Sequence, residues 1–361
     1  MSEDNFRIDH CMPRPPAALG VTLHESARTR PGLTLCHSSG CRSAWLVDLA
    51  GNERHRWRLD RGPRWHEVQL LDSGRLLVVC SDKCYSPKAV SDHGLVELDR
   101  DSNVVWESHA RVHHDARRLA NGNTLVVANA PAQYPEIQSE PFIYDYLQEL
   151  DPEGNVVWTW HFAPHQHQLH LPDDFAPPPG FGDWPHINTA QVLPDTPAAK
   201  RNDCFTAGNV LVSPRHLHRI FVVDRRTGDI VWQWGEGVIL GPHQPTMLPT
   251  GNILLFDNGW GPPLRGWSQV LEIEPATGEI VWRYRTDPPT DFWSPVGSGA
   301  QRLPDGNTLV CAMNWNEPGR VFEVTPDGVI VWEYWNPEER SIYRAYRYAP
   351  DSEAIRNLGV E

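Results

Sequence analysis

The stretch Gly228 to Trp234, GDIVWQW, decides the fold, because variants of it return along the chain at a nearly fixed spacing. The other copies lie at 51–57 (GNERHRW), 102–106 (SNVVW), 154–160 (GNVVWTW), 278–284 (GEIVWRY) and 328–334 (GVIVWEY). The first copy has His55 where the others have a tryptophan, and from there the intervals are 51, 52, 74, 50 and 50 residues. Self-similarity at such a period predicts a repeat fold with six structural units.

A second signature, Leu-x-x-Gly followed by Asn or Arg, precedes most of these strands, as in Leu248 to Leu254 (LPTGNIL). Its glycine marks a hairpin turn, and the alternating residues around it indicate β-strands. Another strand and tight turn lie between the two signatures, for example at 269–278 (QVLEIEPATG). Four short antiparallel strands per fifty residues are typical of a propeller blade, so we expect an all-β, six-bladed β-propeller of four-stranded antiparallel blades.

The two chain ends are expected to share one blade. The segment from Tyr343 to Asp351 repeats the strand and turn that open each blade, and the segment from Leu33 to Trp57 supplies the remaining strands. Such a closure leaves no open sheet edge. We therefore divide the chain into an N-terminal extension (1–30), the propeller (31–351) and a C-terminal tail (352–361), with insertion loops at about 161–185 and 196–207 in the long repeat.

The charge balance and composition narrow the partners and the compartment. The chain carries 46 acidic against 32 basic residues, a net charge of −14. Such a surface repels phosphate backbones and anionic lipids, so we expect neither nucleic acid nor membrane as a partner, while an oligomer remains compatible with it. The N-terminus lacks an export signal and no apolar run could span a membrane, which predicts a cytoplasmic protein unless a leader has been removed. The seven cysteines form no dense framework and are expected to be reduced thiols.

The repeat also predicts a ring of side chains around the propeller axis. The opening strand of each blade lies nearest the axis, so equivalent positions on these strands should face one central funnel. Counting five residues back from the repeat leucine, with Tyr348 in that place in the last blade, gives His66, His114, Asn188, His243, Ser298 and Tyr343. His186 lies two residues before Asn188 and thus on the same side of its strand, and Arg215 ends the next strand of that blade. Such a funnel suits either an anion or a metal ion, whereas the repeated tryptophans are expected to form the core between blades.

At this point several motifs resemble the arylsulfate sulfotransferase (arylsulfotransferase) family of propellers. They are HHDARRLANGN at 113–123, WPHIN at 184–188, LVSPR at 211–215, HQPTMLPTGN at 243–252 and FDNG at 256–259. The resemblance extends from Pro31 to Arg347. The chain departs from the well-studied exported members in having neither a leader, an evident disulfide pair nor the extra N-terminal β-domain, and so is similar to a short, divergent branch.

The resemblance implies an activity and a set of site residues. Enzymes of this family move a sulfuryl group from one phenol to another through a sulfated histidine, without a cofactor or nucleotide donor. His243 matches the nucleophile, and His114, His186, Asn188 and Arg215 match residues around the sulfate. We thus expect a transferase acting on a small aromatic substrate. The catalytic residues would be His243, His114, His186 and Arg215, and the substrate-binding residues Asn188, His66, His113, Ser298 and Tyr343.

Two other functions remain open from the residues themselves. The first is a metal-dependent oxidase or lyase, in which His66, His114, His186 and His243 would bind Cu, Fe or Zn, because several neutral imidazoles suit any of these metals. The second is a non-catalytic propeller that binds a small molecule or serves as a scaffold. A sulfotransferase of this kind needs no stoichiometric metal, so metal content distinguishes the first alternative from the leading hypothesis.

Overall fold

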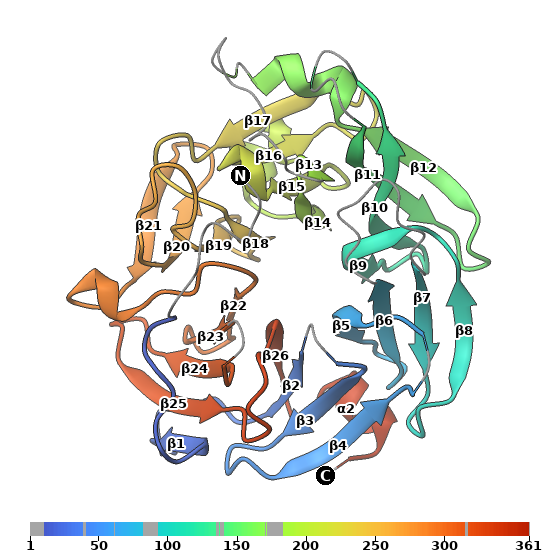
Figure 1. Cartoon of the computed structure of the whole chain (residues 1–361). Coiled ribbons are helices and arrows are strands. Elements are labelled where there is room, and N and C mark those ends of the chain that lie inside the picture. Colours follow the sequence, from blue (N-terminus) through green and yellow to red (C-terminus); the bar gives the residue numbers. More distant parts are fainter. Residues whose placement is uncertain are drawn as a thin grey trace.

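The structure is a computed structural model that describes residues 11–38, 41–60, 62–81, 93–134, 137, 141–169, 171, 183–314 and 317–360. Within these residues, 26 strands form six mainly antiparallel sheets arranged around a central axis (Figure 1). The predicted six-bladed β-propeller is confirmed. Residues 1–10 of the predicted extension, and residues 170 and 172–182 of the predicted loop at about 161–185, lie outside the described residues.

The first three blades in chain order each run from an inner strand at the axis to an outer strand. Their strands are β26 (Arg344–Tyr348), β2 (Leu33–His37), β3 (Ser43–Val47) and β4 (Glu53–Arg58); β5 (Trp65–Leu70), β6 (Leu76–Ser81), β7 (His93–Leu98) and β8 (Val104–Ser108); and β9 (Val112–Arg118), β10 (Thr124–Ala132), β11 (Phe142–Leu150) and β12 (Val156–His161).

The other three blades repeat this order. Their strands are β14 (Ile187–Val192), β15 (Val210–Pro214), β16 (Ile220–Val223) and β17 (Ile230–Trp234); β18 (His243–Met247), β19 (Ile253–Asp257), β20 (Gln269–Glu274) and β21 (Glu279–Tyr284); and β22 (Gly299–Arg302), β23 (Thr308–Ala312), β24 (Arg320–Val324) and β25 (Ile330–Trp335). The connections carry the short helices η2 (Ala163–Leu169), α1 (Ala198–Arg201), η3 (Asp203–Phe205), η4 (Arg215–Leu217) and η5 (Pro289–Asp291).

The ring closes as the sequence predicts. Strand β26, near the end of the chain, pairs antiparallel with β2, near the start of the chain. The pairing runs from Leu33 opposite Tyr348 to His37 opposite Arg344. Both flanking segments also join the propeller. Strand β1 (Gly20–His24) adds a fifth strand beside β25, and α2 (Glu353–Leu358) buries Ala354, Ile355 and Leu358 against the cluster between the closing blade and its neighbour. No helix in the described ranges is long and apolar enough to cross a membrane.

The repeated tryptophans lie at the boundaries between blades. Only Trp332 of the five is fully buried, whereas Trp106, Trp158, Trp232 and Trp282 are half-buried against the clusters between blades. The indole nitrogens of Trp232, Trp282 and Trp332 donate to turn carbonyls of the next blade, those of Pro275, Pro326 and Leu49, at 2.8–3.0 Å. The tryptophans therefore pack on the clusters between blades as expected, with Trp332 inside its cluster and the other four at the edge of theirs.

Glutamines at one repeat position tie neighbouring blades together nearer the axis. In every second blade, a glutamine two residues before the repeat leucine accepts a hydrogen bond from a main-chain N–H of the next inner strand. The pairs are Gln69 with Arg118 at 2.9 Å, Gln191 with Met247 at 2.8 Å and Gln301 with Arg347 at 2.7 Å. These bonds fix the relative register of the inner strands, and with it the positions of the side chains at the axis.

Candidate functional site

The predicted ring residues lie at or just before the first residues of the inner strands. The backbone at this end of the strands is irregular. The pairing of four inner strands with their neighbours shifts register at this end, around His66, around His113 to Asp115, around Asn188 and after His243. His114 and His186 also have positive φ angles, 55° and 62°. A bulge turns a side chain away from the regular alternation of a strand. These irregularities therefore aim polar side chains at the axis that a regular strand would direct into the core.

His243 begins β18 and is buried, with its ring held by two acceptors. Its Nδ1 lies 2.7 Å from Oδ1 of Asn258 and 3.1 Å from the carbonyl oxygen of Gly241. The orientation of the Asn258 amide is fixed, because its nitrogen donates to the carbonyls of Ser294 and Gly297. Oδ1 of Asn258 therefore faces the imidazole and accepts from Nδ1–H, so the lone pair of the neutral ring lies on Nε2.

The surroundings of His243 keep its imidazole neutral. Burial lowers its pKa far below the usual value of 6.5, and the guanidinium groups of Arg215 and Arg344 lower it further. The hydrogen bond with Asn258 works in the opposite direction but does not outweigh burial. At neutral pH the ring is therefore an unprotonated base with its Nδ1 occupied.

A second histidine of the ring, His114, contacts His113, which in turn lies beside the carboxylate of Asp145. Its Nδ1 contacts Nδ1 of His113, and Nε2 of His113 lies 3.0 Å from Oδ1 of Asp145. The carboxylate favours a proton on Nε2 of His113, which makes Nδ1 of that ring the acceptor in the contact with His114. The neutral His114 ring then holds its proton on Nδ1 and its lone pair on Nε2. Burial raises the pKa of Asp145 to about 6, and His113 opposes that rise.

His186 has a carboxylate partner of its own. The two-residue strand β13 (Asp183–Trp184) pairs parallel with β11, which places Asp183 beside the end of that strand. Oδ2 of Asp183 lies 2.6 Å from Nδ1 of His186. The carboxylate favours a proton on Nδ1, so this ring also keeps its lone pair on Nε2. His216, whose pKa burial lowers far below its usual value, lies beside His186 with the rings tilted and their centroids 4.6 Å apart.

His66 differs from the other histidines because its Nδ1 is an acceptor. The main-chain N–H of His114 donates to Nδ1 of His66 at 3.0 Å. The neutral ring consequently carries its proton on Nε2, where it is a donor rather than a base or a metal ligand. Tyr343 lies next to His66, with ring centroids 5.3 Å apart, and its buried hydroxyl has no hydrogen-bond partner in the described part of the chain.

The aromatic rings form one continuous row near the propeller axis. The distances between ring centroids are 5.3 Å for Tyr343 with His66, 4.1 Å for His66 with His114, 4.6 Å for His114 with His186 and 4.6 Å for His186 with His216. The structure thus brings together four of the predicted residues and adds His216, which follows Arg215 in the sequence. Among the described residues, one group has three ligand atoms that all lie within 4.8 Å of one another, in Asp183, His186 and His216.

Asn188 and Arg215 lie next to His243. The side-chain amide of Asn188 donates to the carbonyl of Pro242, the residue before His243, at 2.8 Å. The guanidinium of Arg215 lies over the ring of Trp260, 4.2 Å from its centroid, and close enough to His243 to lower that pKa. Ser298 is turned into its own loop, because its hydroxyl contacts Ser294 at 2.6 Å and accepts from the N–H of Met313. The polar groups next to His243 are therefore an amide and a guanidinium.

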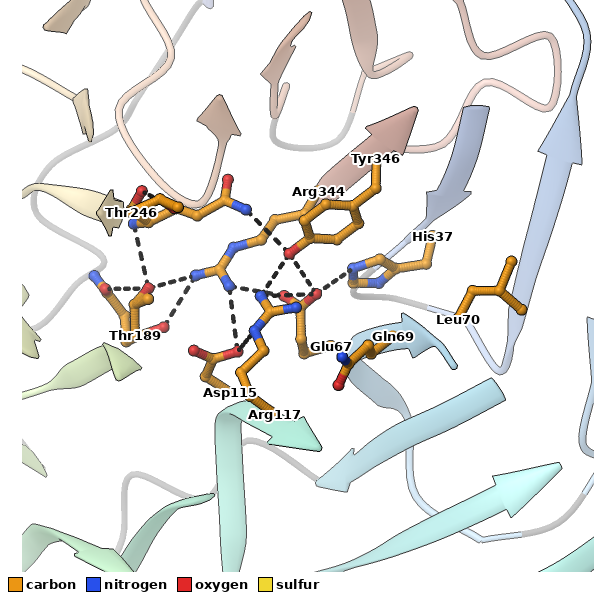
Figure 2. A network of polar contacts seen from close by, with 12 residues as sticks. His37, Glu67, Gln69, Leu70, Asp115, Arg117, Thr189, Thr246, Arg344 and Tyr346 are labelled. Atoms are coloured by element: carbon orange, nitrogen blue, oxygen red, sulfur yellow. Dashed lines mark hydrogen bonds and ion pairs between the residues drawn. The ribbon is translucent and has the colours of Figure 1, made fainter. Parts of the chain in front are cut away.

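An axial polar layer lies next to these histidines, one residue further along each inner strand (Figure 2). Its members stand four residues before the repeat leucines, and they are Glu67, Asp115, Thr189, Gln244 and Arg344, with Gly299 at the sixth position. A Cβ at Gly299 would lie 1.7 Å from Oε1 of Gln244, so the glycine leaves room for that side chain.

Arg344 connects the axial polar layer. It pairs with Glu67 at 2.9 Å and with Asp115 at 3.6 Å, and it donates to Oγ1 of Thr189 at 2.9 Å and to the carbonyl of Asn188 at 3.0 Å. Arg117 contributes a second cation, 3.1 Å from Asp115. The two cations and two carboxylates balance, which makes a buried charge layer tolerable. Arg344 also fixes the main chain that carries Asn188.

The sequence indicated some of the supporting residues only indirectly. Asn258 lies in the FDNG motif, Trp260 directly follows it, and Asp115 follows the His113-His114 pair. Asp145 lies on the third strand of its blade and has no motif of its own. Asp183 lies three residues before His186, a spacing that gives no signal without the turn that joins them.

The fold and this histidine-lined centre define a propeller protein with a polar axial site, and comparison with known proteins places the chain in a family. The arylsulfotransferase (ASST) family model matches residues 27–239, more than half of the chain. The protein therefore belongs to the arylsulfotransferase family. The matched range includes His66, His114, His186, Asn188 and Arg215, but it ends before His243.

Among solved structures, one shares the overall fold, and at its low identity it shows the fold alone. A protein of unknown function from Bacteroides caccae is 15% identical, with a TM-score of 0.57, over 88% of this chain and 98% of that one. BamB from Moraxella catarrhalis is 12% identical over 92% of this chain and 98% of that one, with a TM-score of 0.42. No curated protein matches the chain.

Proposed function

We propose that the protein transfers a sulfuryl group from a phenolic sulfate ester to a phenolic acceptor through a sulfated His243. The observation that carries this proposal is the state of His243, a buried neutral imidazole whose Nδ1–H is bound by Asn258. Such a ring presents the lone pair of Nε2 without first losing a proton, which is what a nucleophile at neutral pH requires. Membership in the arylsulfotransferase family supports the same reaction class.

The partners of the three histidines support different roles for them. A carboxylate stabilises the imidazolium form, so Asp145 behind His113 and Asp183 beside His186 suit rings that accept and return protons. The neutral amide of Asn258 fixes the tautomer of His243 without favouring its protonation to the same degree. His243 is therefore the better nucleophile, and His114 and His186 are the better general bases.

The proposed reaction has two balanced steps. Nε2 of His243 attacks the sulfur of the donor, an N–S bond forms, and the S–O bond breaks so that the phenolate leaves with its electron pair. The phenolate oxygen takes a proton from solvent. The acceptor phenol then gives its proton to the neutral ring of His114 or His186, its oxygen attacks the sulfur, and the N–S electrons return to Nε2. The imidazolium formed in this step releases its proton to solvent. A phenol, with a pKa of about 10, serves equally as leaving group and nucleophile.

Donor groups around His243 suit the charge on the sulfuryl oxygens. Arg215 supplies a guanidinium fork, and Asn188 has a second amide hydrogen beyond the one bound to Pro242. His66 presents Nε2–H to the same funnel. Fixed donors of this kind stabilise charge that spreads over the equatorial oxygens during transfer. The rings of Trp260 and Tyr343 offer aromatic surface for the aryl group.

The proposal is tested with a chromogenic aryl sulfate and an added phenol. We expect release of the chromophore that depends on the phenol, and a mass increase of one sulfuryl group on His243 when the donor is added alone. His243→Ala should lose both signals, while His24→Ala, at an exposed position on β1, should keep them. The proposal fails if the wild-type protein neither transfers a sulfuryl group nor gains its mass on His243.

A second candidate function, a metal-dependent oxidase or lyase reaction, is favoured by one observation. The ligand atoms of Asp183, His186 and His216 lie within 4.8 Å of one another and all three residues are buried. Two imidazoles and a carboxylate are a donor set that Zn, Fe and Cu accept. His186 is the one member that this group shares with the predicted set of His66, His114, His186 and His243. These three residues would hold the ion, which would supply Lewis acidity or redox chemistry.

Metal content decides between the two candidates. Protein purified without a histidine tag is analysed for transition metals, together with Asp183→Ala and His216→Ala. One equivalent of metal that disappears in both variants supports the second candidate. A substoichiometric content with intact sulfuryl transfer supports the first.

A further inference from the structure

We propose that the protein has a second anion site, separate from the axial funnel, for a phosphate or sulfate monoester of a polar alcohol. The site is a cavity of about 460 Å³ lined by five arginines, Arg42, Arg56, Arg58, Arg64 and Arg340. It is formed by strands of the closing blade and by the loops on either side of that blade. These segments are the start of β3, the end of β4 with the loop that leads to β5, and the loop between β25 and β26.

The cavity opens on the same face as the funnel but away from the axis. The loop from β4 to β5 joins an outer strand to the next inner strand, as does the loop from β17 to β18 that leads into His243. Equivalent loops of a propeller lie on one face. Arg58 is the last residue of β4 and Arg64 lies in the loop from β4 to β5. A ligand in the cavity therefore lies on the same face of the propeller as the loop that leads into His243, but near the outer edge of that face.

The arginines of the cavity are only partly balanced by acidic groups. Two carboxylates, those of Asp60 and Glu338, line the cavity beside the five arginines. Arg56 pairs with Glu338 at 2.7 Å and with Glu53. In the described part of the chain no carboxylate forms an ion pair with Arg42, Arg58 or Arg340. This concentration of positive charge contrasts with the chain as a whole, which has 46 acidic and 32 basic residues. An anionic ligand would supply the missing charge.

Two of these arginines are held in position by neutral acceptors. Nε of Arg42 donates to the carbonyl of Gly62 at 2.6 Å, and Nη1 of Arg340 donates to Sγ of Cys41 at 3.1 Å. Each bond uses one of the five guanidinium hydrogens and leaves the others available. A guanidinium that is already oriented loses less entropy when it binds, and its planar fork matches the oxygens of a phosphate or sulfate group.

The size and lining of the cavity define the rest of the ligand. A volume of about 460 Å³ lies in the range of small-molecule sites and exceeds what an inorganic anion fills. Leu59 is the one large apolar side chain among the described residues that line it, and none of those residues is aromatic. The body of the ligand is therefore polar, as in a sugar ester. This distinguishes the cavity from the funnel, where aromatic rings are abundant.

Calorimetric titration with glucose 6-phosphate, glucose 6-sulfate, inorganic phosphate and glucose tests the proposal. We expect at least one ester to bind more tightly than inorganic phosphate, and more weakly as salt is raised, because the side chains are exposed and screened. The ester that binds more tightly shows whether the cavity prefers a phosphate or a sulfate group. Failure of both esters to bind, or binding no tighter than inorganic phosphate, overturns the proposal.

Variants assign any observed binding to this cavity. The double variant Arg58→Gln/Arg340→Gln should weaken ester binding about tenfold or more, the effect of losing charge-assisted hydrogen bonds. Both side chains are exposed, so an unchanged melting temperature shows that the fold is kept. Arg226→Gln, at an exposed turn elsewhere, and Arg215→Gln, in the funnel, should bind as the wild type does. Equal binding by the double variant, or a loss on Arg215→Gln, places the ester elsewhere and overturns the proposal.

Discussion

Nδ1 of His243 lies 2.7 Å from Oδ1 of Asn258, an amide whose orientation is fixed by two main-chain carbonyls. The pair resembles a carboxylate–histidine pair in geometry but lacks the negative charge. Since a carboxylate in this place would favour the imidazolium, the amide keeps a buried histidine both oriented and unprotonated. This relationship leads directly to the first prediction.

Asn258→Asp should make the proposed activity depend on pH in a range where the wild type is insensitive. The new carboxylate raises the pKa of His243, so kcat/KM should fall as the pH drops through the new value and recover at high pH. Asn258→Ala should lower kcat/KM about 10- to 100-fold at every pH, because the ring loses its orientation. The measurement is the pH profile of kcat/KM for the wild type and for both variants. Asn121→Asp, at an exposed turn, is the control. Identical profiles for wild type and Asn258→Asp would contradict the tautomer assigned to His243.

Asp145→Asn should reverse the tautomers of the His113–His114 pair. Oδ2 of Asp145 accepts from the N–H of Ile187, so the new amide would keep its oxygen there and turn its nitrogen towards His113. Nε2 of His113 must then accept, its proton moves to Nδ1, and His114 loses the lone pair on Nε2. If His114 is the general base, kcat should fall by roughly 10²- to 10⁴-fold while KM changes little. An unchanged kcat would remove His114 from this role and leave His186.

The same substitution should change stability with a defined sign. The pKa of Asp145 is raised to about 6 by burial, so in the folded state it holds a proton that it releases more readily when unfolded. The stability contributed by the protonated form is present below about pH 4 and is lost as the pH rises through 6. Asp145→Asn should therefore gain stability relative to wild type by about 1.4 kcal/mol per pH unit between pH 4 and 6. Urea unfolding at pH 4, 5, 6 and 7 measures the difference, and a constant difference would contradict the raised pKa.

Arg344 and Glu67 should show strong coupling in a double-mutant cycle. Both are completely buried and 2.9 Å apart. Removing one partner of a buried pair typically costs about 3 to 5 kcal/mol, because the other charge is left uncompensated. Arg344→Met and Glu67→Gln should each destabilise strongly, whereas the double variant should lose less than the sum. Additive losses in urea unfolding would mean that Arg117 and Asp115 compensate each charge separately.

The spacing of the tryptophans and leucines was enough to predict the propeller, its six blades and the shared closing blade. Those features depend on local patterns, namely turns and alternation, which are written in adjacent residues. The same count placed His66, His114 and His243 at the axis. It did not identify the neighbouring position as a charge layer, because Glu67, Asp115 and Arg344 acquire meaning only when three distant blades bring them together.

The carboxylate partners of the histidines could not be predicted from the sequence either. Asp145 reaches His113 from the third strand of the same blade, and Asp183 reaches His186 across a tight turn. Both contacts depend on bulges and positive φ angles at the ends of the inner strands. Such irregularities cannot be read from a regular repeat. In contrast, Asn258 lies in the recognisable FDNG motif. The sequence did not show that its hydrogen-bond partner is His243.

His37→Leu should stabilise the protein increasingly as the pH falls. His37 is completely buried on β2, both of its ring nitrogens lack a hydrogen-bond partner among the described residues, and its Nε2 is 3.9 Å from Glu67. Burial, together with the guanidinium groups of Arg344 and Arg117, lowers the pKa of His37 to about 3. Replacing an unsatisfied polar ring by an apolar side chain of similar size should be neutral or stabilising even at pH 8.

The pH dependence of that substitution follows from the same lowered pKa. Above pH 6.5 His37 is neutral in both states, so the difference between His37→Leu and wild type should be constant. Below pH 6.5 the unfolded chain binds a proton that the folded chain excludes, so the wild type loses stability as the pH falls towards 3. The advantage of the variant should grow by about 1.4 kcal/mol per pH unit between pH 6 and 4. Urea unfolding at three pH values measures this slope. A slope of zero would mean that the folded protein admits the proton, with Glu67 as its partner.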